Sequence, residues 1–239
     1  MKIIGDKKNQ DKCKYLKNSL LYNQEKYFDN NLTLELNNDQ IILLNHNYNP
    51  PVSISIDFLD QSFINKIDQR LNQSEIFLKI FQKKHSKILD CTAGFGRDSY
   101  LLRSLGFNLV MIEKNPVISL ILKHAVEKIK KSNFYLYHGD ALDFLNHTDM
   151  IFDYIYFDFM FNKSKNKSLS SKNDEVLKIL AEDDDNREEL IDLAITKCRE
   201  RVVIKGPIHK HNNNKIKLKP NYSITSKLLK YDMYLAKNE

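Results

Sequence analysis

Two of the chain's six glycines lie in one short segment between two acidic residues. The segment runs from Asp90 to Asp98, between a predicted strand and a predicted helix, and its glycines are Gly94 and Gly96. Glycine at such a turn lets a ligand approach the backbone closely. Glu113 ends the next predicted strand, where a carboxylate can accept hydrogen bonds from both hydroxyls of a ribose. These residues therefore predict a site for a nucleoside-containing cofactor.

The charge of this segment favours one cofactor over another. A dinucleotide site usually has a third glycine and places a pyrophosphate at the helix N-terminus, but here Ser99 takes the third position and carboxylates flank the loop. S-adenosylmethionine instead carries a sulfonium and an ammonium group, which carboxylates attract. We therefore predict S-adenosylmethionine as the cofactor. A dinucleotide, or a tight turn without a ligand, is the alternative.

A further carboxylate follows the third predicted strand. Asp140, which precedes Ala141, stands where an adenine amino group would lie in this arrangement. An aspartate there is also a suitable N-cap for the short helix that follows, and the two roles are compatible.

The fourth predicted strand is aromatic and ends in an acid, Asp158. An exocyclic base amine is a poor nucleophile because its lone pair is delocalised into the ring, so it needs an acceptor that holds its hydrogens. Asp158 and the carbonyl of Phe159 are predicted to do this, while Phe161 stacks on the base. The alternatives are a turn carboxylate for Asp158 and core packing for Phe161.

Lysines follow this acid in a segment that is rich in hydroxyl side chains and poor in apolar ones. Beside a ligand crevice, Lys163, Lys165 and Lys167 would bind phosphates, and Lys205 at the end of a later strand would add a further cation. These four lysines are therefore the predicted RNA-binding residues. The alternative is a solvated linker.

Strands and helices alternate over most of the chain. This alternation predicts an α/β fold, with a Rossmann-like parallel sheet and helices on both faces. Asp98 is expected to open the first helix after the glycine segment and Gly106 to close it, while Asn115 opens the next. We predict strands at 87–91, 108–112, 133–138, 152–158 and 201–205, helices at 98–105, 116–131, 141–145, 174–181 and 186–199, and two terminal strands at 222–224 and 227–235.

The first sixty residues differ from this pattern. Residues 1–30 are polar and are predicted to form a loosely packed arm. A hairpin over 32–44 and a strand over 52–56 follow, and a helix is expected from about residue 72 to Lys84. We therefore predict an arm with a small β-rich module at 1–60 and the cofactor-binding domain at 61–239.

Composition narrows the class of protein. Of the 239 residues, 42% are hydrophobic and 28% charged, which is typical of a globular protein. No apolar run is long enough for a membrane span, and three scattered cysteines fit a reducing cytoplasm. The net charge of +6 is compatible with a polyanionic partner or with an ordinary lysine-rich surface. His209 and His211 are predicted to be surface residues, and no metal site is expected.

Several of these segments together resemble the RsmJ-type methyltransferases, which use S-adenosylmethionine to methylate N2 of a guanine in 16S ribosomal RNA. The similarity covers roughly residues 52–235 and is carried by 90–98, 111–117, 158–161, 201–207 and 231–234. It implies a class I methyltransferase fold with an N-terminal β-rich module. It also implies cofactor contacts from Arg97, Asp98, Glu113, Lys114, Asp140, Ala141 and Asp158.

The sequence departs from the family at the acid itself. The family has proline after the acid and again after the aromatic position, and here Phe159 and Asn162 replace both prolines. Because proline fixes φ, the base-holding turn is expected to be less rigid.

The combined reading is a cytoplasmic methyltransferase that acts on 16S ribosomal RNA or the small ribosomal subunit. One alternative is a methyltransferase with another RNA or a protein as substrate. Another is an RNA-binding or ribosome-assembly factor that keeps the fold without turnover. An enzyme would not tolerate the loss of Asp158, whereas an assembly factor would.

Overall fold

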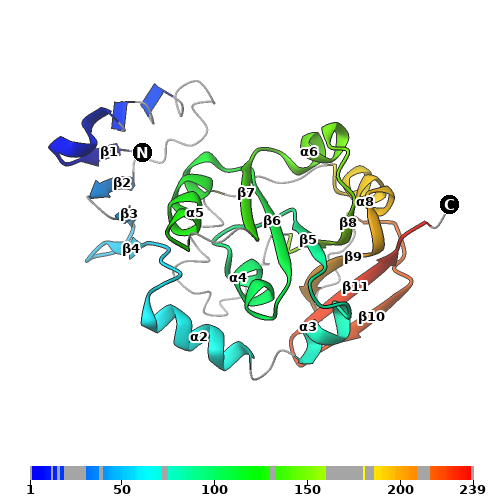
Figure 1. Cartoon of the computed structure of the whole chain (residues 1–239). Coiled ribbons are helices and arrows are strands. Elements are labelled where there is room, and N and C mark those ends of the chain that lie inside the picture. Colours follow the sequence, from blue (N-terminus) through cyan, green and yellow to red (C-terminus); the bar gives the residue numbers. More distant parts are fainter. Residues whose placement is uncertain are drawn as a thin grey trace.

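The computed structural model describes residues 2–11, 13–14, 17–18, 31–37, 40–71, 75–129, 133–159, 180, 186–208 and 216–237. Within these residues, a seven-stranded sheet has the order β10-β11-β9-β8-β5-β6-β7 (Figure 1). Its strands are β5 (Lys87–Asp90), β6 (Asn108–Glu113), β7 (Phe134–His138), β8 (Phe152–Phe157), β9 (Cys198–Pro207), β10 (Tyr222–Thr225) and β11 (Leu229–Leu235).

The order of the strands fixes where a ligand can bind. From β5 the chain moves outward through β6 and β7, then returns to place β8 on the other side of β5. These strands and β9 pair in parallel, whereas β11 and β10 are antiparallel additions at the far edge. In open α/β sheets the ligand crevice lies at the carboxyl ends of the strands where the order reverses. Here that point is the carboxyl end of β5.

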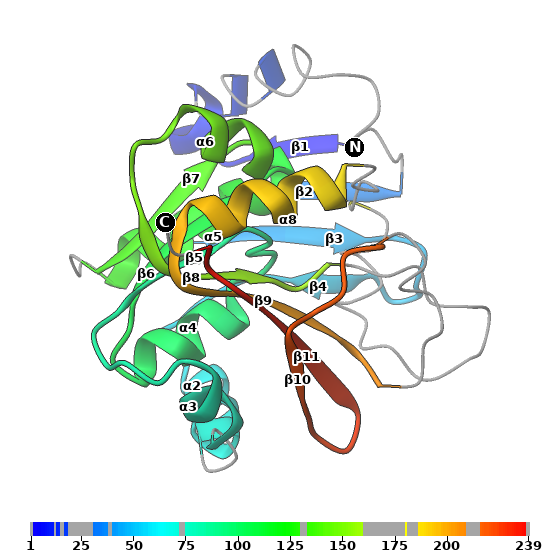
Figure 2. The ribbon, with the colours of Figure 1, turned by 90° about the vertical axis from the view of Figure 1, so that its right-hand side faces the viewer.

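Helices cover both faces of this sheet. Ile88 of β5 belongs to the same buried cluster as the apolar residues of α4 (Arg97–Ser104) and α5 (Pro116–Ile129). Leu89, its neighbour, belongs to a second cluster with α6 (Ala141–His147) and α8 (Arg187–Thr196). Figure 2 shows α4 and α8 on opposite sides of β8 and β9. Because successive side chains point to opposite faces, strands covered on both sides are apolar throughout. The predicted α/β fold is confirmed.

A second sheet lies beside α5 and has the order β1-β2-β3-β4 (Figure 1). Its strands are β1 (Lys2–Gly5), β2 (Leu32–Asn37), β3 (Gln40–Asn45) and β4 (Val52–Ile54), and a short 3-10 helix, η1 (Lys7–Asn9), follows β1. The predicted hairpin and the strand after it are present. The sheet's buried leucines belong to the same apolar cluster as α4 and α5, so the two sheets share a core. The domain boundary near residue 60 stays a prediction.

The first residues do not form the predicted loose arm. β1 pairs in parallel with β2, and the side chain of Ile3 is buried in the common core. A four-residue strand in a polar stretch is stabilised by this pairing with a segment about thirty positions further on, so the local sequence carried little signal for it. Residues 19–30 lie outside the described residues.

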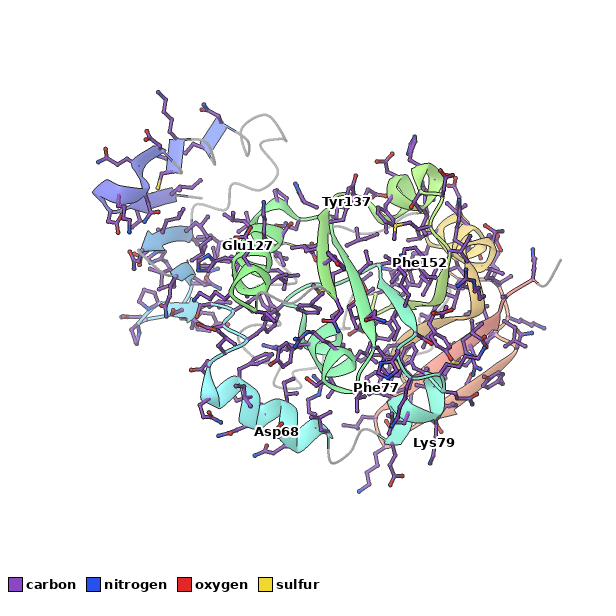
Figure 3. The ribbon with its side chains drawn as sticks, viewed as in Figure 1. Asp68, Phe77, Lys79, Glu127, Tyr137 and Phe152 are labelled. Carbon is purple, nitrogen blue, oxygen red and sulfur yellow. The ribbon has the colours of Figure 1, made fainter. Side chains whose placement is uncertain are left out.

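Two helices connect the sheets where one was predicted. α2 (Gln61–Leu71) was missed, and α3 (Glu75–Ile80) is shorter than expected. Asp60 stabilises the start of α2, since its carboxylate accepts the backbone N–H of Phe63 at 3.0 Å. On α2 one buried residue, Ile67, stands among exposed ones such as Asp68 (Figure 3). Phe63, Ile67 and Leu71 nevertheless follow helical spacing and pack toward the core, so the sequence analysis overlooked a signal that was present.

The helix caps match the predictions at three of four places. The side chains of Asn115 and Asp140 accept backbone N–H groups of α5 and α6. Gly106 follows α4 with a φ of 96°, as a helix-terminating glycine does. Asp98, however, does not cap α4. That helix begins at Arg97 after Gly96, and the Asp98 carboxylate has other partners. The predicted helix over 174–181 lies outside the described residues except for Leu180.

Candidate active site

Four acidic residues mark the carboxyl ends of four parallel strands. Asp90 is the last residue of β5 and Glu113 the last of β6, while Asp140 and Asp158 follow β7 and β8 closely. Because parallel strands end at the same edge of a sheet, these residues lie along one edge. Lys205 lies on β9, the strand that neighbours β8, and its ammonium contacts Asp158.

The loop from β5 to α4 is held against the end of β6. The Glu113 carboxylate accepts the backbone N–H of Gly94 at 2.8 Å and that of Asn115 at 2.7 Å. Gly94 and Gly96 have φ angles of 54° and 68°, which L side chains rarely adopt. The predicted partnership between the glycine loop and Glu113 is therefore present, and the contact of Glu113 with a ribose stays a prediction.

Replacing Gly96 with alanine is expected to destabilise the protein by about 1–3 kcal/mol. A Cβ on Gly96 would lie 2.7 Å from Cδ1 of Leu122 and 3.0 Å from Cζ of Phe58, in addition to the cost of its positive φ. Gly106→Ala is the matched control, because its φ is also positive but its Cβ would meet no atom within 4 Å. Urea unfolding of the two variants measures the difference. Equal losses of stability in the two variants would show that Leu122 and Phe58 move away from the added methyl group at little cost.

Asp90 lies beneath the loop rather than beside a ligand. Its side chain accepts the Thr92 backbone N–H at 3.1 Å and the Ser99 hydroxyl at 2.5 Å, and the residue is 2% exposed. Burial raises the pKa of Asp90 to about 7. This geometry makes Asp90 an anchor of the loop, and its cofactor contact stays a prediction.

This raised pKa predicts a pH-dependent stability. The folded carboxyl keeps its proton up to about pH 7, whereas the unfolded one ionises near 3.8, so the folded state binds more protons between these values. The contribution of Asp90 to the free energy of unfolding therefore falls as the pH rises, by up to about 1.4 kcal/mol per pH unit. Relative to wild type, Asp90→Asn should gain stability from pH 4 to 7. The exposed Asp68→Asn is the control, and parallel pH curves for wild type and Asp90→Asn would contradict the assignment.

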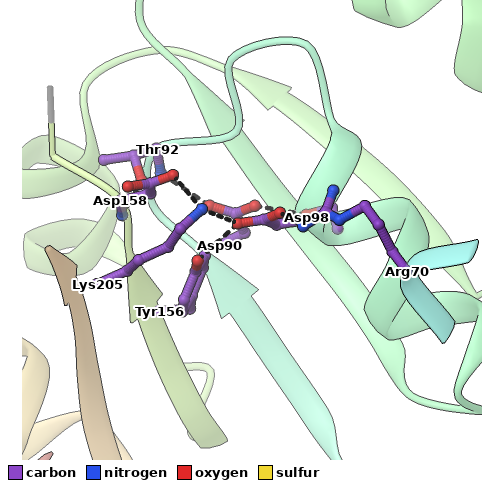
Figure 4. Close-up of polar contacts among 8 residues, drawn as sticks. Arg70, Asp90, Thr92, Asp98, Tyr156, Asp158 and Lys205 are labelled. Atoms are coloured by element: carbon purple, nitrogen blue, oxygen red, sulfur yellow. Dashed lines mark hydrogen bonds and ion pairs between the residues drawn. The ribbon is translucent and has the colours of Figure 1, made fainter. Parts of the chain in front are cut away.

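A chain of alternating charges crosses the site (Figure 4). Arg70 of α2 donates to Asp98 Oδ1 at 2.6 Å, and the Lys205 ammonium lies 2.6 Å from Asp98 Oδ2 and 2.8 Å from Asp158 Oδ2. The Tyr156 hydroxyl donates to Asp98 Oδ2 at 2.7 Å. Two cations thus match two carboxylates, so Asp98 is neutralised by the protein itself. The expectation that it faces a cationic ligand as a bare carboxylate is corrected.

The pKa values in this chain follow from burial and from the neighbouring charges. Burial favours a neutral Asp98, but Lys205 and Arg70 outweigh it and hold the pKa of this carboxyl well below its usual range. Burial likewise favours a neutral Lys205, yet Asp98 and Asp158 raise its pKa well above the ordinary value. Burial raises the pKa of Asp158, Lys205 opposes this rise and Asp98 adds to it. The charge on Asp158 therefore depends on Lys205, which opposes the rise in its pKa.

Asp158 is also the accessible acid of the group. Its side chain is 41% exposed, and its backbone N–H donates to the Thr92 hydroxyl of the glycine loop at 2.7 Å. The next residue, Phe159, is buried, and its ring stacks on Phe157 with the Arg187 guanidinium 4.9 Å from its centroid. The Phe159 side chain is thus part of the core, and its predicted carbonyl role stays a prediction.

The β7 end carries a second ion pair. Lys114 lies 3.0 Å from Asp140, which also caps α6, and both side chains are about 40% exposed. Burial favours a neutral Asp140, but Lys114 and the cap N–H groups lower its pKa overall. Ala141 is buried as the first residue of α6, and Arg97 begins α4 with its guanidinium 6.0 Å from the Phe95 ring centroid. These predicted cofactor residues therefore lie at the same edge as the loop.

The described residues do not include every predicted site residue. Phe161, Lys163, Lys165 and Lys167 lie outside them, as do the two histidines near residue 210. Among the residues that are described, no group of His, Cys, Asp or Glu side chains is placed to hold a metal ion. The sequence analysis missed Arg70 and Tyr156. Tyr156 stands on a predicted strand, but no local signal linked Arg70 to Asp98 across 28 positions.

The geometry of this edge fits S-adenosylmethionine. Gly94 and Gly96 give the loop its positive φ angles, and the Glu113 carboxylate holds the loop at Gly94. Asp140 and Asp158 supply accessible carboxylates on either side. This site, on a seven-stranded sheet with antiparallel strands at one edge, defines a class I SAM-dependent methyltransferase fold. The crystal structure of a SAM-dependent methyltransferase from Neisseria gonorrhoeae has this fold, with a TM-score of 0.69 at 20% identity over 100% of this chain and 97% of that one.

The family is shown by sequence. The model of the family described as "Putative SAM-dependent methyltransferase" matches residues 17–236. The chain therefore belongs to this family of SAM-dependent methyltransferases, and S-adenosylmethionine is its cofactor.

Curated relatives specify the resemblance further. The proteins named "Ribosomal RNA small subunit methyltransferase J" from Coxiella burnetii and Legionella pneumophila are 36% identical over 159 and 163 residues, each match covering 64% of this chain. The one from Buchnera aphidicola is 28% identical over 87% of both chains. The match spans 62% of the length of the Coxiella protein. The predicted resemblance to RsmJ-type enzymes is confirmed.

Proposed function

We propose that this protein transfers a methyl group from S-adenosylmethionine to N2 of a guanine in 16S ribosomal RNA. The observation that carries the proposal is the position of Asp158, an accessible carboxylate at the carboxyl end of β8 and in contact with the glycine loop through Thr92. The names of the relatives support ribosomal RNA of the small subunit as the substrate. The proposed partner is accordingly 16S RNA or the small ribosomal subunit, and the proposed location is the cytoplasm.

The chemistry divides between the cofactor and the protein. When bound, S-adenosylmethionine supplies an activated methyl group on a sulfonium, so the protein's main task is to position the amine. Asp158 accepts a hydrogen of the exocyclic amine and so directs the nitrogen lone pair away from the carboxylate. Since Lys205 contacts Oδ2, the acceptor that faces the amine is Oδ1. The new N–C bond would form as the C–S bond of the cofactor breaks, and S-adenosylhomocysteine would leave. The negative charge on Asp158 stabilises the positive charge that develops on the amine, and Asp158 is the acceptor for the proton that the methylated amine releases.

Binding of RNA rests on a different part of the chain. The net charge of +6 favours a polyanion, and we propose Lys163, Lys165 and Lys167, which follow Asp158 in sequence, as phosphate-binding residues. Lys205 is withdrawn from this set. Its ammonium is held between two carboxylates and its side chain is 14% exposed, so it is poorly placed to contact a phosphate.

Transfer of tritium from labelled S-adenosylmethionine tests the proposal. Naked 16S RNA, 30S particles lacking the modification and total protein are offered in parallel, and we expect label in RNA from one or both of the first two. Label found only in the protein fraction would show that the substrate is a protein and not ribosomal RNA. Cofactor binding without label in any fraction would favour the assembly factor.

A further inference from the structure

We propose that Lys205 is a positioning residue for Asp158, holding one carboxylate oxygen so that the other is presented to the substrate amine. This inference rests on the proposed function. None of the helices in the described part of the chain is long and apolar enough to cross a membrane.

The first support is geometric. Lys205 is on β9, which pairs in parallel with β8, and its ammonium bridges Asp158 Oδ2 at 2.8 Å and Asp98 Oδ2 at 2.6 Å. An ammonium has three donors, and two of them are directed at these carboxylates. A carboxylate at the end of a strand can rotate about its χ angles unless a partner fixes it. The ion pair therefore selects one orientation of Asp158.

The second support is that Lys205 is itself held in place. Asp98 anchors it, and Asp98 is fixed in turn by Arg70 of α2 and by the Tyr156 hydroxyl. The chain of contacts thus runs from α2 through α4 and β9 to the end of β8 (Figure 4). Side chains locked by packing and by further hydrogen bonds hold a reacting group more accurately than an isolated lysine would.

The third support is electrostatic. Besides Lys205, the groups that act on Asp158 are Asp98 of α4 and Arg70 of α2. Among the described residues, the buried carboxyl of Asp90 on β5 and the phenols of Tyr156 on β8 and Tyr231 on β11 are the other titratable groups around the pair. Without Lys205, Arg70 would be the cation among the described residues that the two carboxylates share. Asp158 would then keep its proton to higher pH, and a protonated carboxyl accepts the amine less well.

The experiment compares Lys205→Met, Lys205→Gln and Lys205→Arg with the wild type in single-turnover methyl transfer to 16S RNA across pH. Thermal melting first establishes which variants are folded, and having two neutral replacements guards against one that unfolds. Lys128→Met is the matched control, because Lys128 of α5 also pairs with an aspartate, Asp57, at 3.0 Å, whereas Asp158 and Asp98 pair with Lys205.

We expect the neutral variants to lose about tenfold to 10²-fold in rate near neutral pH. The acidic limb of their pH profile should move up by about one to three units. Lys205→Arg should restore most of the rate, and Lys128→Met should behave as wild type. A rate that falls equally at every pH would overturn the proposal. A higher KM for RNA with a reduced salt dependence would also overturn it and would show that Lys205 binds phosphate.

A titration that needs no activity separates this inference from the proposed function. Carbon-13 NMR of labelled aspartate carboxyls, with the Asp158 signal assigned by its absence in Asp158→Asn, reports the pKa of Asp158 directly. A higher pKa in Lys205→Met than in wild type supports the coupling even if 16S RNA is not the substrate. An unchanged pKa refutes it even if the enzyme methylates 16S RNA.

Discussion

Asp158→Asn is expected to lower methyl transfer to RNA by about 10²–10³-fold at saturating cofactor. The amide keeps the shape of the side chain but removes the charge that favours the developing cation on the amine. It also breaks the charge-assisted contact with Lys205, which lies 2.8 Å from the carboxylate. Single-turnover transfer of label at saturating S-adenosylmethionine measures the effect.

The control for this variant is Asp143→Asn. Asp143 is an exposed aspartate on α6 that pairs with His147 of the same helix. This control should leave transfer within about twofold of wild type, as is usual for surface substitutions. Undiminished transfer by Asp158→Asn would remove the residue from the mechanism, and undiminished RNA binding with no transfer would confirm its chemical role.

Glu113→Gln is expected to weaken binding of S-adenosylmethionine by about tenfold to 10²-fold. Charge-assisted hydrogen bonds are worth about 1.5–3 kcal/mol, and the amide loses that assistance toward the ribose. A second effect follows from the structure. Because both carboxylate oxygens accept backbone N–H groups, from Gly94 and Asn115, one of these donors must face the new amide NH₂ group. Isothermal titration calorimetry measures the affinity.

Glu127→Gln on the outer surface of α5 is the matched control (Figure 3). It should bind the cofactor as the wild type does. Equal affinities for Glu113→Gln and wild type would show that the ribose lies elsewhere. A lower affinity for both variants would point to a general change in charge.

The core of the fold was predictable because its signals are local. The strands of the central sheet are short apolar runs, and the turns and caps around α4 to α6 use residues such as Gly106, Asn115 and Asp140. Such patterns depend on neighbours within a few positions, so reading them needs no knowledge of the tertiary structure. β1 was missed because pairing with the distant β2 stabilises it, whereas α2 was overlooked although its apolar residues follow helical spacing.

The site was predictable in its position but not in its electrostatics. Glycines after the first strand and acids at successive strand ends locate the crevice, because the topology of parallel strands brings them together. The partners of Asp98 come from Arg70 and Lys205, which are 28 and 107 positions away. Nothing in the local sequence shows that these cations neutralise it. The burial of Asp90 under the loop also depends on the tertiary structure, so the local sequence does not show it.

The measurement that tests the account most directly is the identity of the methylated nucleoside. Unmodified 16S RNA is incubated with the protein and S-adenosylmethionine, digested to nucleosides and analysed by mass spectrometry against authentic standards. The account predicts N2-methylguanosine with wild type, and its formation about 10²–10³-fold more slowly with Asp158→Asn. Methylation of a different base or of a ribose hydroxyl by the wild type would contradict the role assigned to Asp158 at the end of β8.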